Sequence, residues 1–307
     1  MAETPWGEMP IADAHVHFFS HRFYSALAAQ KKVPDAAALA PLLEWDIPSA
    51  DPVELAAQWV AELDKFGVRK AALIASIPGD EESVEAAVAS YPDRFFGYFM
   101  LDPMKPGAHD RVKGAFERKQ LQCLCLFPAM HGYSIADPRL VPIFKTAADN
   151  RAVVFVHCGA FSVGVRKKLG LSNSFDMRYS QPMDLHPVAL HFPQIRFIVP
   201  HFGAGYLRET LMLADTAPNV YLDTSSSNRW MLYDPSGLDI RTVYRRALDV
   251  VGNKRILFGT DSSFFPRGWN AEIFEQQTKA IYELALPADE AQLILHDNLV
   301  RLMAGGF

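Results

Sequence analysis

The fold of this chain is decided by one stretch near its start, Ile11-Ala12-Asp13-Ala14-His15-Val16-His17. It is an apolar run that ends in two histidines separated by one residue. In an extended strand alternate side chains share a face, so His15 and His17 are predicted to point the same way. Two imidazoles on one face at the end of a strand are typical of a metal site, and the other ligands should come from elsewhere in the chain.

Three further apolar runs end in a residue that can bind a metal. They are Val153-Val154-Phe155-Val156-His157, Phe197-Ile198-Val199-Pro200-His201 and Ile256-Leu257-Phe258-Gly259-Thr260-Asp261. A lone histidine at a strand end is more often structural than a ligand. Five polar groups at buried strand ends would be costly unless something satisfied them, and one shared ion could do so. Imidazoles with one carboxylate suit a borderline divalent ion such as zinc.

Apolar runs alternate with amphipathic segments along the whole chain. The predicted strands are 11–17, 68–75, 95–101, 122–127, 152–157, 195–201, 219–224 and 255–261. The predicted helices are 52–66, 81–91, 107–119, 138–149, 183–192, 203–215, 239–252 and 271–284, with a last helix at 288–304. The strands are apolar on both faces, as buried parallel strands are, and strict alternation favours right-handed crossovers.

Eight parallel strands could form an open sheet or a closed barrel. In an open sheet the first and last strands would lie about 34 Å apart, which is seven gaps of ~4.8 Å. His15 and Asp261 could not then bind one ion. The sequence therefore predicts a single (β/α)₈ barrel (TIM barrel) over residues 1–307, with its site at the carboxyl ends of the strands and the last helix packed outside. Two long insertions, 18–50 and 158–182, should emerge at that face and contact the substrate.

Composition narrows the class of protein. The formal net charge is −5, half of the residues are hydrophobic and 21% are charged, which is typical of a soluble globular enzyme. No basic block indicates nucleic acid binding, and no apolar stretch approaches the roughly 18 residues of a membrane helix. The start lacks the pattern of a secretion signal, and Cys123, Cys125 and Cys158 cannot form a disulfide framework. We therefore expect a cytoplasmic protein.

Several motifs together resemble those of the amidohydrolase superfamily. They are His15-Val16-His17, His157 after the fifth strand, Pro200-His201-Phe202-Gly203 after the sixth and Gly259-Thr260-Asp261 after the eighth. Longer stretches are similar to the amidohydrolase-related branch, also called family 2. These are Phe192-Pro193-Gln194-Ile195-Arg196-Phe197, Pro218-Asn219-Val220-Tyr221-Leu222-Asp223-Thr224-Ser225 and Asp297-Asn298-Leu299-Val300-Arg301-Leu302. The resemblance covers residues 10–306.

The resemblance implies that His15, His17, His157 and Asp261 bind the metal or its water. His201 matches a histidine that often polarises the water in mononuclear members. Binuclear relatives carry a bridging lysine or glutamate on the fourth strand, where this chain has Cys125. We therefore expect one divalent ion, Zn²⁺ first and Mn²⁺ as the alternative. Cys125 could itself ligate zinc, but a small buried residue inside the barrel is the favoured interpretation.

The same ligands serve two reactions. A bound ion can lower the pKa of its water to about 7, Asp261 could accept and return a proton, and His201 could hold the water or an oxyanion. The first hypothesis is hydrolysis of an amide, ester or lactone. The alternative is non-oxidative decarboxylation of an aromatic or dienoic acid, which this branch also contains. A catalytically dead barrel is disfavoured because the ligand set is complete.

The expected partner is a small-molecule substrate, with a homo-oligomer left open. Arg229 and Arg267 follow the seventh and eighth strands, and either could clamp a carboxylate bidentately. Trp230 and Trp269 lie beside them and could stack on a planar substrate, and His131 after the fourth strand is a further candidate contact. Four other histidines fall in helical or helix-end patterns and are predicted to be structural or surface residues: His109, His186, His191 and His296.

Overall fold

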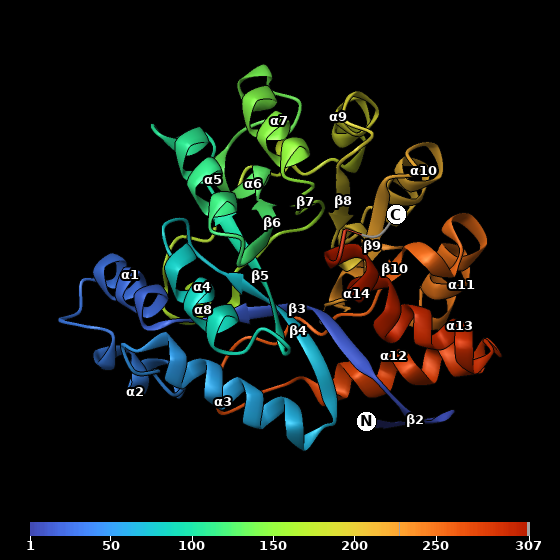
Figure 1. Cartoon of the computed structure of the whole chain (residues 1–307), viewed down its shortest axis with the longest axis horizontal. Coiled ribbons are helices and arrows are strands. Elements are labelled where there is room, and N and C mark those ends of the chain that lie inside the picture. The colour runs from blue at the N-terminus through green and yellow to red at the C-terminus, as the bar shows by residue number, and fades with distance from the viewer. Residues whose placement is uncertain (227, 306–307) are drawn as a thin grey trace.

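Eight parallel strands form the wall of a barrel in the computed structural model, which describes residues 1–226 and 228–305 (Figure 1). The strands are β3 (Ile11–Phe18), β4 (Val68–Ala75), β5 (Phe95–Leu101), β6 (Leu121–Leu126), β7 (Val153–Val156), β8 (Arg196–Val199), β9 (Val220–Asp223) and β10 (Ile256–Leu257). Each is hydrogen-bonded to the next along the chain, from β3 to β10. The predicted barrel architecture is confirmed.

The barrel closes where β10 returns to β3. Val16 forms an isolated parallel bridge with Ser262. The Ala14 N–H donates to the carbonyl of Phe258 at 2.8 Å, and the His17 N–H donates to the carbonyl of Ser262 at 2.7 Å. The first and last strands of the barrel are therefore neighbours, as they must be if His15 and Asp261 bind one ion.

Strand β10 is much shorter than the predicted span 255–261. The backbone N–H groups that follow β10 donate to acceptors outside the neighbouring strands. That of Phe258 donates to Ile294, and that of Gly259 donates to the Thr224 hydroxyl at 3.2 Å. Because the ladder is broken there, the chain can turn Asp261 toward the barrel axis.

A β-bulge in β3 aims the two histidines inward. The register with β4 slips between Asp13 and Val16, so that one extra residue is accommodated. Ala12, before the slip, and Ala14, within it, belong to the interior cluster of the barrel, whereas Val16 belongs to the outer layer. A one-residue slip reverses which side chains face the core, so His15 and His17 point inward.

Helices surround the barrel close to the predicted positions. They are α3 (Pro52–Lys65), α4 (Glu81–Ser90), α5 (Ala108–Glu117), α7 (Val141–Asp149), α9 (His186–His191), α10 (Leu207–Thr216), α11 (Ile240–Val251) and α12 (Ala271–Glu283). Asp51 caps α3 by accepting from the Val53 N–H at 2.9 Å, with Pro52 in the first turn. Helix α10 begins four residues later than predicted because His201, Phe202 and Ala204 have left-handed backbone conformations.

The two insertions fold onto each other and form what we call the cap, residues 18–50 and 158–182. The cap contains α1 (His21–Lys31), α2 (Ala40–Leu43) and α8 (Gly164–Lys168), which Figure 1 labels on the same side of the barrel. A separate apolar cluster joins the two insertions, with Phe23 and Leu43 from one and Val165 and Leu169 from the other. The Arg166 guanidinium also donates to Gln30 at 2.6 Å.

The end of the chain differs from the prediction. The predicted helix 288–304 is divided into α13 (Ala288–Gln292), a π-helical turn (Leu293–Asp297) and α14 (Asn298–Met303). Its apolar residues Leu299, Leu302 and Met303 join the interior cluster of the barrel, so the helix does not pack outside as expected. Asn298 donates to the carbonyl of Ile256, the first residue of β10, at 2.9 Å, so α14 begins at the amino end of that strand. The hairpin β1 (Ala2–Thr4) with β2 (Gly7–Met9) was not predicted either.

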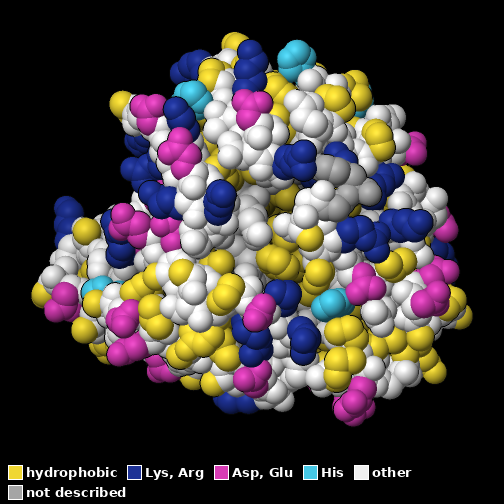
Figure 2. Space-filling model, in the orientation of Figure 1, with side chains coloured by type: hydrophobic (Ala, Val, Ile, Leu, Met, Phe, Trp, Pro, Cys, Tyr) yellow, Lys and Arg dark blue, Asp and Glu magenta, His cyan; other side chains and the backbone are white. Residues whose placement is uncertain are grey.

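The surface carries charges of both signs, interspersed in the view of Figure 2. Over residues 1–226 and 228–305, no helix combines the length and the apolar character needed to cross a bilayer.

Candidate metal centre

Three ligand atoms converge at the carboxyl ends of β3 and β10. Nε2 of His15 lies 3.3 Å from Nε2 of His17, and Oδ1 of Asp261 lies 3.7 Å and 3.4 Å from these two nitrogens. A tetrahedral centre with metal–ligand bonds of about 2.0–2.1 Å separates its ligand atoms by about 3.3–3.4 Å. The spacing of His15, His17 and Asp261 therefore fits one divalent ion.

Hydrogen bonds on the far side of each ring fix the direction of these nitrogens. Nδ1 of His15 donates to Oδ2 of Asp223 at 2.7 Å, and Oγ of Ser225 lies 2.8 Å from the same nitrogen. Nδ1 of His17 lies 2.8 Å from Oγ of Ser76. With Nδ1 occupied, both rings present Nε2 to the ion, which is how metal-binding histidines are usually oriented.

No role was predicted from the sequence for Asp223, Ser225 or Ser76. Asp223 and Ser225 stand at the end of β9 and Ser76 directly after β4, at the same edge of the barrel as the ligands. The five ligand candidates were predicted because they are polar residues at strand ends. These three residues share that feature, so it could have identified them too.

Asp13 supports the centre from the outer side of β3. Its buried carboxylate accepts from the N–H groups of His15 and Thr260 at 2.9 Å and 3.1 Å, from the Thr260 hydroxyl at 2.5 Å and from the indole of Trp269 at 2.8 Å. Burial raises the pKa of Asp13 to about 6, although these hydrogen bonds act in the opposite direction. The residue ties the strand that carries His15 to the segment that carries Asp261.

Asp261 and His201 both occupy strained backbone conformations, each with a φ of 57°. Residues without the freedom of glycine seldom adopt this region, and when they do the surrounding structure must hold them there. Thr260, bound twice by Asp13, precedes Asp261 directly. Strain of this kind clusters at functional sites and agrees with the convergence of ligands.

His201 lies beside the three ligands. Its ring centroid is 5.0 Å from that of His15, and its Nδ1 donates to the Ser225 carbonyl at 2.6 Å. Burial, followed by the charge of His15, lowers the pKa of His201. A neutral imidazole that donates through Nδ1 carries its lone pair on Nε2, so His201 offers Nε2 as a proton acceptor.

His157 stands on the other side of His201, with ring centroids 5.2 Å apart. Its ring packs against those of Phe127, at 5.5 Å, and Phe161, at 4.5 Å. Burial and the charge of His201 lower its pKa well below the usual value. His157 does not belong to the group whose ligand atoms all lie within 4.8 Å of one another, which consists of His15, His17 and Asp261 among the described residues.

Asp261 is the anionic member of the centre. Burial alone would raise its pKa, but the hydrogen bond with His17 and the charge of His15 outweigh burial and hold the pKa well below its usual range. Burial acts to lower the pKa of His15, but Asp223, Asp261 and Asp13 together outweigh burial and raise that pKa. The centre thus combines one carboxylate with the imidazoles of His15 and His17, a donor set suited to a divalent cation.

Arg267 is brought to the centre. Its guanidinium donates to the carbonyl of Asp261 at 3.1 Å and to the hydroxyl of Ser263 at 3.0 Å, and it lies over the ring of Phe264 at 4.6 Å. Arg229 is exposed in the 3₁₀ turn Arg229–Tyr233. His131 ends the short helix α6 (Pro128–His131), with its ring parallel to that of Tyr133 at 6.5 Å, and is not among the three converging ligands.

The two tryptophans are not where a substrate platform was expected. Trp269 is 2% exposed, packs between Phe66 and Phe274, and uses its indole N–H on Asp13. Trp230 is 5% exposed and belongs to the main hydrophobic core. Both tryptophans therefore pack in the protein interior, and their stacking on a planar substrate stays a prediction. Cys125 lies fully buried in the interior cluster, where it packs as a small apolar residue.

Aromatic rings of the cap reach the centre instead. Phe19 lies 5.6 Å from the ring of His17 and stacks on Phe23 at 4.0 Å. Trp45 stacks on Phe264 at 3.8 Å, which joins the cap to the segment after β10. The insertion 18–50 was predicted to contact the substrate, but its sequence does not show which of its aromatic rings face the centre.

Comparisons with known proteins identify the family of the chain. The model of the family described as Amidohydrolase matches residues 12–302. Among curated proteins, Protein fluG of Emericella nidulans is 31% identical over 94 residues, which is 31% of this chain and 10% of that protein. The chain thus matches only about a tenth of that relative's length.

Three solved structures illustrate the likeness of fold. 5-Carboxyvanillate decarboxylase LigW from Sphingomonas paucimobilis has a TM-score of 0.65 at 16% identity, with 97% of this chain and 99% of that chain covered. IDCase from Metarhizium anisopliae has a TM-score of 0.64 at 16% identity, with 96% and 97% covered. A probable 2-pyrone-4,6-dicarboxylic acid hydrolase from Acinetobacter baumannii has a TM-score of 0.61 at 15% identity, with 96% and 99% covered. At these identities the likeness establishes the barrel fold and leaves the reaction open.

Proposed function

Because the chain belongs to the amidohydrolase family, we propose that it is a metal-dependent hydrolase that cleaves an amide, ester or lactone in a small carboxylated molecule. The observation that carries this proposal is the convergence of Nε2 of His15, Nε2 of His17 and Oδ1 of Asp261, at separations of 3.3–3.7 Å. Ligand atoms on strands at opposite ends of the chain are placed at the spacing that one small divalent ion needs.

In this proposal one ion is bound per chain. His15, His17 and Asp261 would hold it, and His157, which lies outside that converging group, would be its fourth ligand, kept neutral by burial and therefore able to donate a lone pair. Cys125 at the fourth strand leaves no bridging carboxylate for a second ion. Zn²⁺ suits the imidazole-rich set best. Mn²⁺ is the alternative, since a 5-carboxyvanillate decarboxylase from Novosphingobium aromaticivorans, a structural relative, was solved with manganese bound.

Two proton carriers border the ion site. A divalent ion held there supplies water acidic enough to lose a proton near neutral pH. The Asp261 carboxylate would take a proton from the attacking water and return it to the leaving group. Nε2 of His201 faces the same space, because Nδ1 is committed to Ser225, and it accepts a hydrogen bond from water or, when protonated, stabilises a developing oxyanion. Hydrolysis needs one proton removed and one returned, and this pair of residues matches both tasks.

Arg267 is the proposed clamp for a substrate carboxylate. It is preferred to Arg229 because it contacts the backbone of Asp261 and so lies next to the ion site. A planar guanidinium can hold a carboxylate through two parallel hydrogen bonds and orient the rest of the substrate.

Decarboxylation is the second candidate function, and one observation favours it. The ion site is bordered by Arg267 and by the rings of Phe19, Phe127 and Phe161, which lie 4.5–5.6 Å from His17 or His157. A cation among aromatic rings suits an aromatic acid, and two of the structural relatives above carry decarboxylase names. The same ion site would then orient the carboxylate that leaves as carbon dioxide.

A substrate panel separates the two functions. The zinc-loaded and the manganese-loaded protein would be incubated with lactones, anilides and aromatic carboxylic acids, and acid formation and carbon dioxide release would be measured together. We expect acid release from a lactone or an amide without carbon dioxide. Carbon dioxide formed in step with substrate loss, and no cleavage of any ester, lactone or amide, would replace hydrolysis by decarboxylation. The Asp261→Asn protein serves as the blank.

A further inference from the structure

Gln277, on α12, is a fully buried polar side chain that uses all of its hydrogen-bonding positions. Its Oε1 accepts from the hydroxyls of Thr224, at 2.6 Å, and Tyr244, at 2.7 Å. Its Nε2 donates to the backbone carbonyls of Thr224, at 3.0 Å, and Gly259, at 3.1 Å. A carboxamide has two acceptor and two donor positions, so this side chain is completely satisfied by the groups around it.

The first backbone partner, Thr224, lies between the two residues that orient histidines of the candidate metal centre. Asp223 precedes it and accepts from Nδ1 of His15 at 2.7 Å. Ser225 follows it, and the Ser225 carbonyl accepts from Nδ1 of His201 at 2.6 Å. A shift of this short segment at the end of β9 would therefore move the hydrogen-bond partners of both rings.

The second backbone partner, Gly259, lies two residues before Asp261, where the ladder of β10 is broken. Its N–H donates to the Thr224 hydroxyl at 3.2 Å, and its carbonyl accepts from Gln277. The Gly259 backbone also packs closely against the centre, since a Cβ atom at this position would lie 2.8 Å from Oδ1 of Asp223. Gln277 and Thr224 thus take the place of strand pairing between β9 and the segment that carries Asp261.

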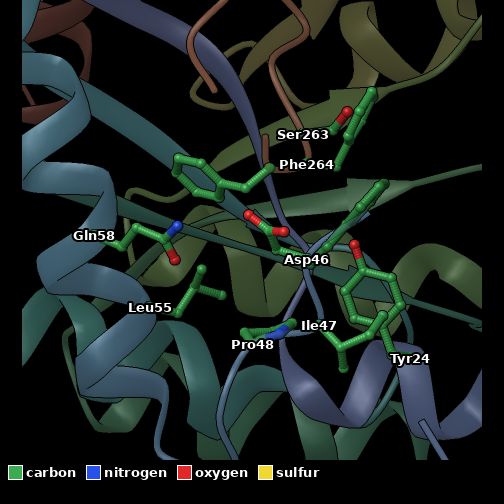
Figure 3. A pocket seen from close by; sticks show the side chains of 10 residues that line it. Tyr24, Asp46, Ile47, Pro48, Leu55, Gln58, Ser263 and Phe264 are labelled. Carbon is green, nitrogen blue, oxygen red and sulfur yellow. The ribbon is translucent and has the colours of Figure 1, made fainter. Parts of the chain in front are cut away.

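The chain that follows Asp261 is held separately, by the cap. Ser263 and Phe264 line a small cavity together with Asp46 of the cap (Figure 3). The Asp46 N–H donates to the Phe265 carbonyl at 3.0 Å, which ties the cap to this segment through the backbone. Asp261 therefore lies between two points of attachment, the end of β9 on one side and the cap on the other.

We propose that Gln277 is a positioning residue for the ion site, because its carboxamide fixes the segment that carries Asp261 against the end of β9, which orients His15 and His201. The inference rests on the proposed ion site and adds a residue that acts on it through other residues. Only an amide serves, since two buried carbonyls need N–H donors while two hydroxyls need an acceptor. Without the amide these buried groups would lose their partners, which is costly unless the two segments move apart.

Replacing Gln277 by Met is expected to weaken Zn²⁺ binding about tenfold, the lower end of the effects seen when a group that supports metal ligands is removed. Methionine has nearly the same length and volume but neither donates to the two carbonyls nor accepts well from the two hydroxyls. The affinity would be measured on the full-length protein by competition with a chromophoric chelator. The thermal unfolding midpoint of each variant would be recorded on the same samples.

Asn219→Leu is the matched control, because it removes a comparable amide from the other end of the same strand. Asn219 is buried and donates to three backbone carbonyls, at 3.0–3.3 Å, directly before the first residue of β9. We expect Asn219→Leu to lower the unfolding midpoint and to leave the Zn²⁺ affinity at its native value. The comparison separates loss of stability from displacement of the ligands.

A second measurement needs no ion. Long-range ¹H–¹⁵N NMR spectra of the metal-free protein report the protonation and hydrogen bonding of each ring nitrogen of His15 and His201. We expect Gln277→Met to shift the Nδ1 resonances of both rings, because their acceptors at the end of β9 move. Asn219→Leu should leave these resonances at their native positions.

Thr224→Val tests the same connection if Gln277→Met does not fold. It removes the hydroxyl that joins Gly259 to Gln277 but keeps the shape of the side chain, so we expect a smaller weakening of Zn²⁺ binding. Native affinity and native histidine resonances in the variant that folds, or equal weakening by Asn219→Leu, would overturn the proposal. If the native protein binds no Zn²⁺, the proposed ion site fails, and the histidine resonances still decide the role of Gln277.

Discussion

Replacing Asp261 by Asn is expected to lower kcat by about 10²–10⁴-fold, which is the usual contribution of one general acid–base group. The amide has nearly the same shape as the carboxylate but cannot accept a proton. The strained backbone of residue 261 should persist, because Asn tolerates the left-handed conformation well and Asp13 continues to hold Thr260. The measurement is kcat on whichever substrate the panel identifies.

Asp261 also contributes a ligand atom, so the ion content must be measured on the same sample. An inductively coupled plasma measurement separates loss of the ion from loss of proton transfer. Asp249→Asn, at an exposed position of α11, is the control for purification and handling. Near-normal kcat in an Asp261→Asn protein that retains its ion would rule out the proton-transfer role.

Replacing Asp223 by Ala is expected to weaken binding of the divalent ion by about 10–100-fold, the usual effect of removing a group that hydrogen-bonds a metal-binding histidine. Asp223 is fully buried and accepts from Nδ1 of His15 at 2.7 Å. Without it, the His15 ring loses the partner that turns Nε2 toward the ion and increases its basicity. Binding would be measured by competition with a chromophoric chelator.

Asp223→Asn is the matched variant, because its amide oxygen can still accept from Nδ1 although its charge is gone. We expect an affinity between those of the native protein and Asp223→Ala. Ser76→Ala should have a smaller effect than Asp223→Ala, since a hydroxyl supports His17 where a carboxylate supports His15. Unchanged affinity in Asp223→Ala would show that His15 is not oriented by this contact, or that it does not bind the ion.

The parts of the fold that could be predicted from sequence are those set by local pattern. Strands β4 and β5 were predicted at 68–75 and 95–101 and are found there, because a short run of apolar residues bounded by polar ones has few alternatives in a buried sheet. The order of the strands followed from alternation with helices. The convergence of His15, His17 and Asp261 followed from their places at strand ends, together with closure of the barrel.

Other features depend on contacts that a single sequence does not reveal. The bulge in β3 exists because the segment pairs with β4 on one side and with the β10 segment on the other, and nothing in Asp13-Ala14-His15-Val16 marks the extra residue. Trp269 was expected at the substrate because it follows a loop arginine. Its partner Asp13 is 256 residues away in sequence, so the contact that buries it could not be anticipated. The position of the cap ring of Phe19 beside His17 could not be anticipated from the sequence either.

The central claim is that one divalent ion, held by His15, His17 and Asp261, is required for turnover. The most direct test strips the protein of metal with a chelator and adds Zn²⁺ or Mn²⁺ back in known amounts while activity is recorded. The account predicts that the stripped protein is inactive and that activity rises in proportion to added ion, reaching its plateau at one ion per chain. A plateau at two ions, or full activity in protein shown by elemental analysis to contain no metal, would contradict it.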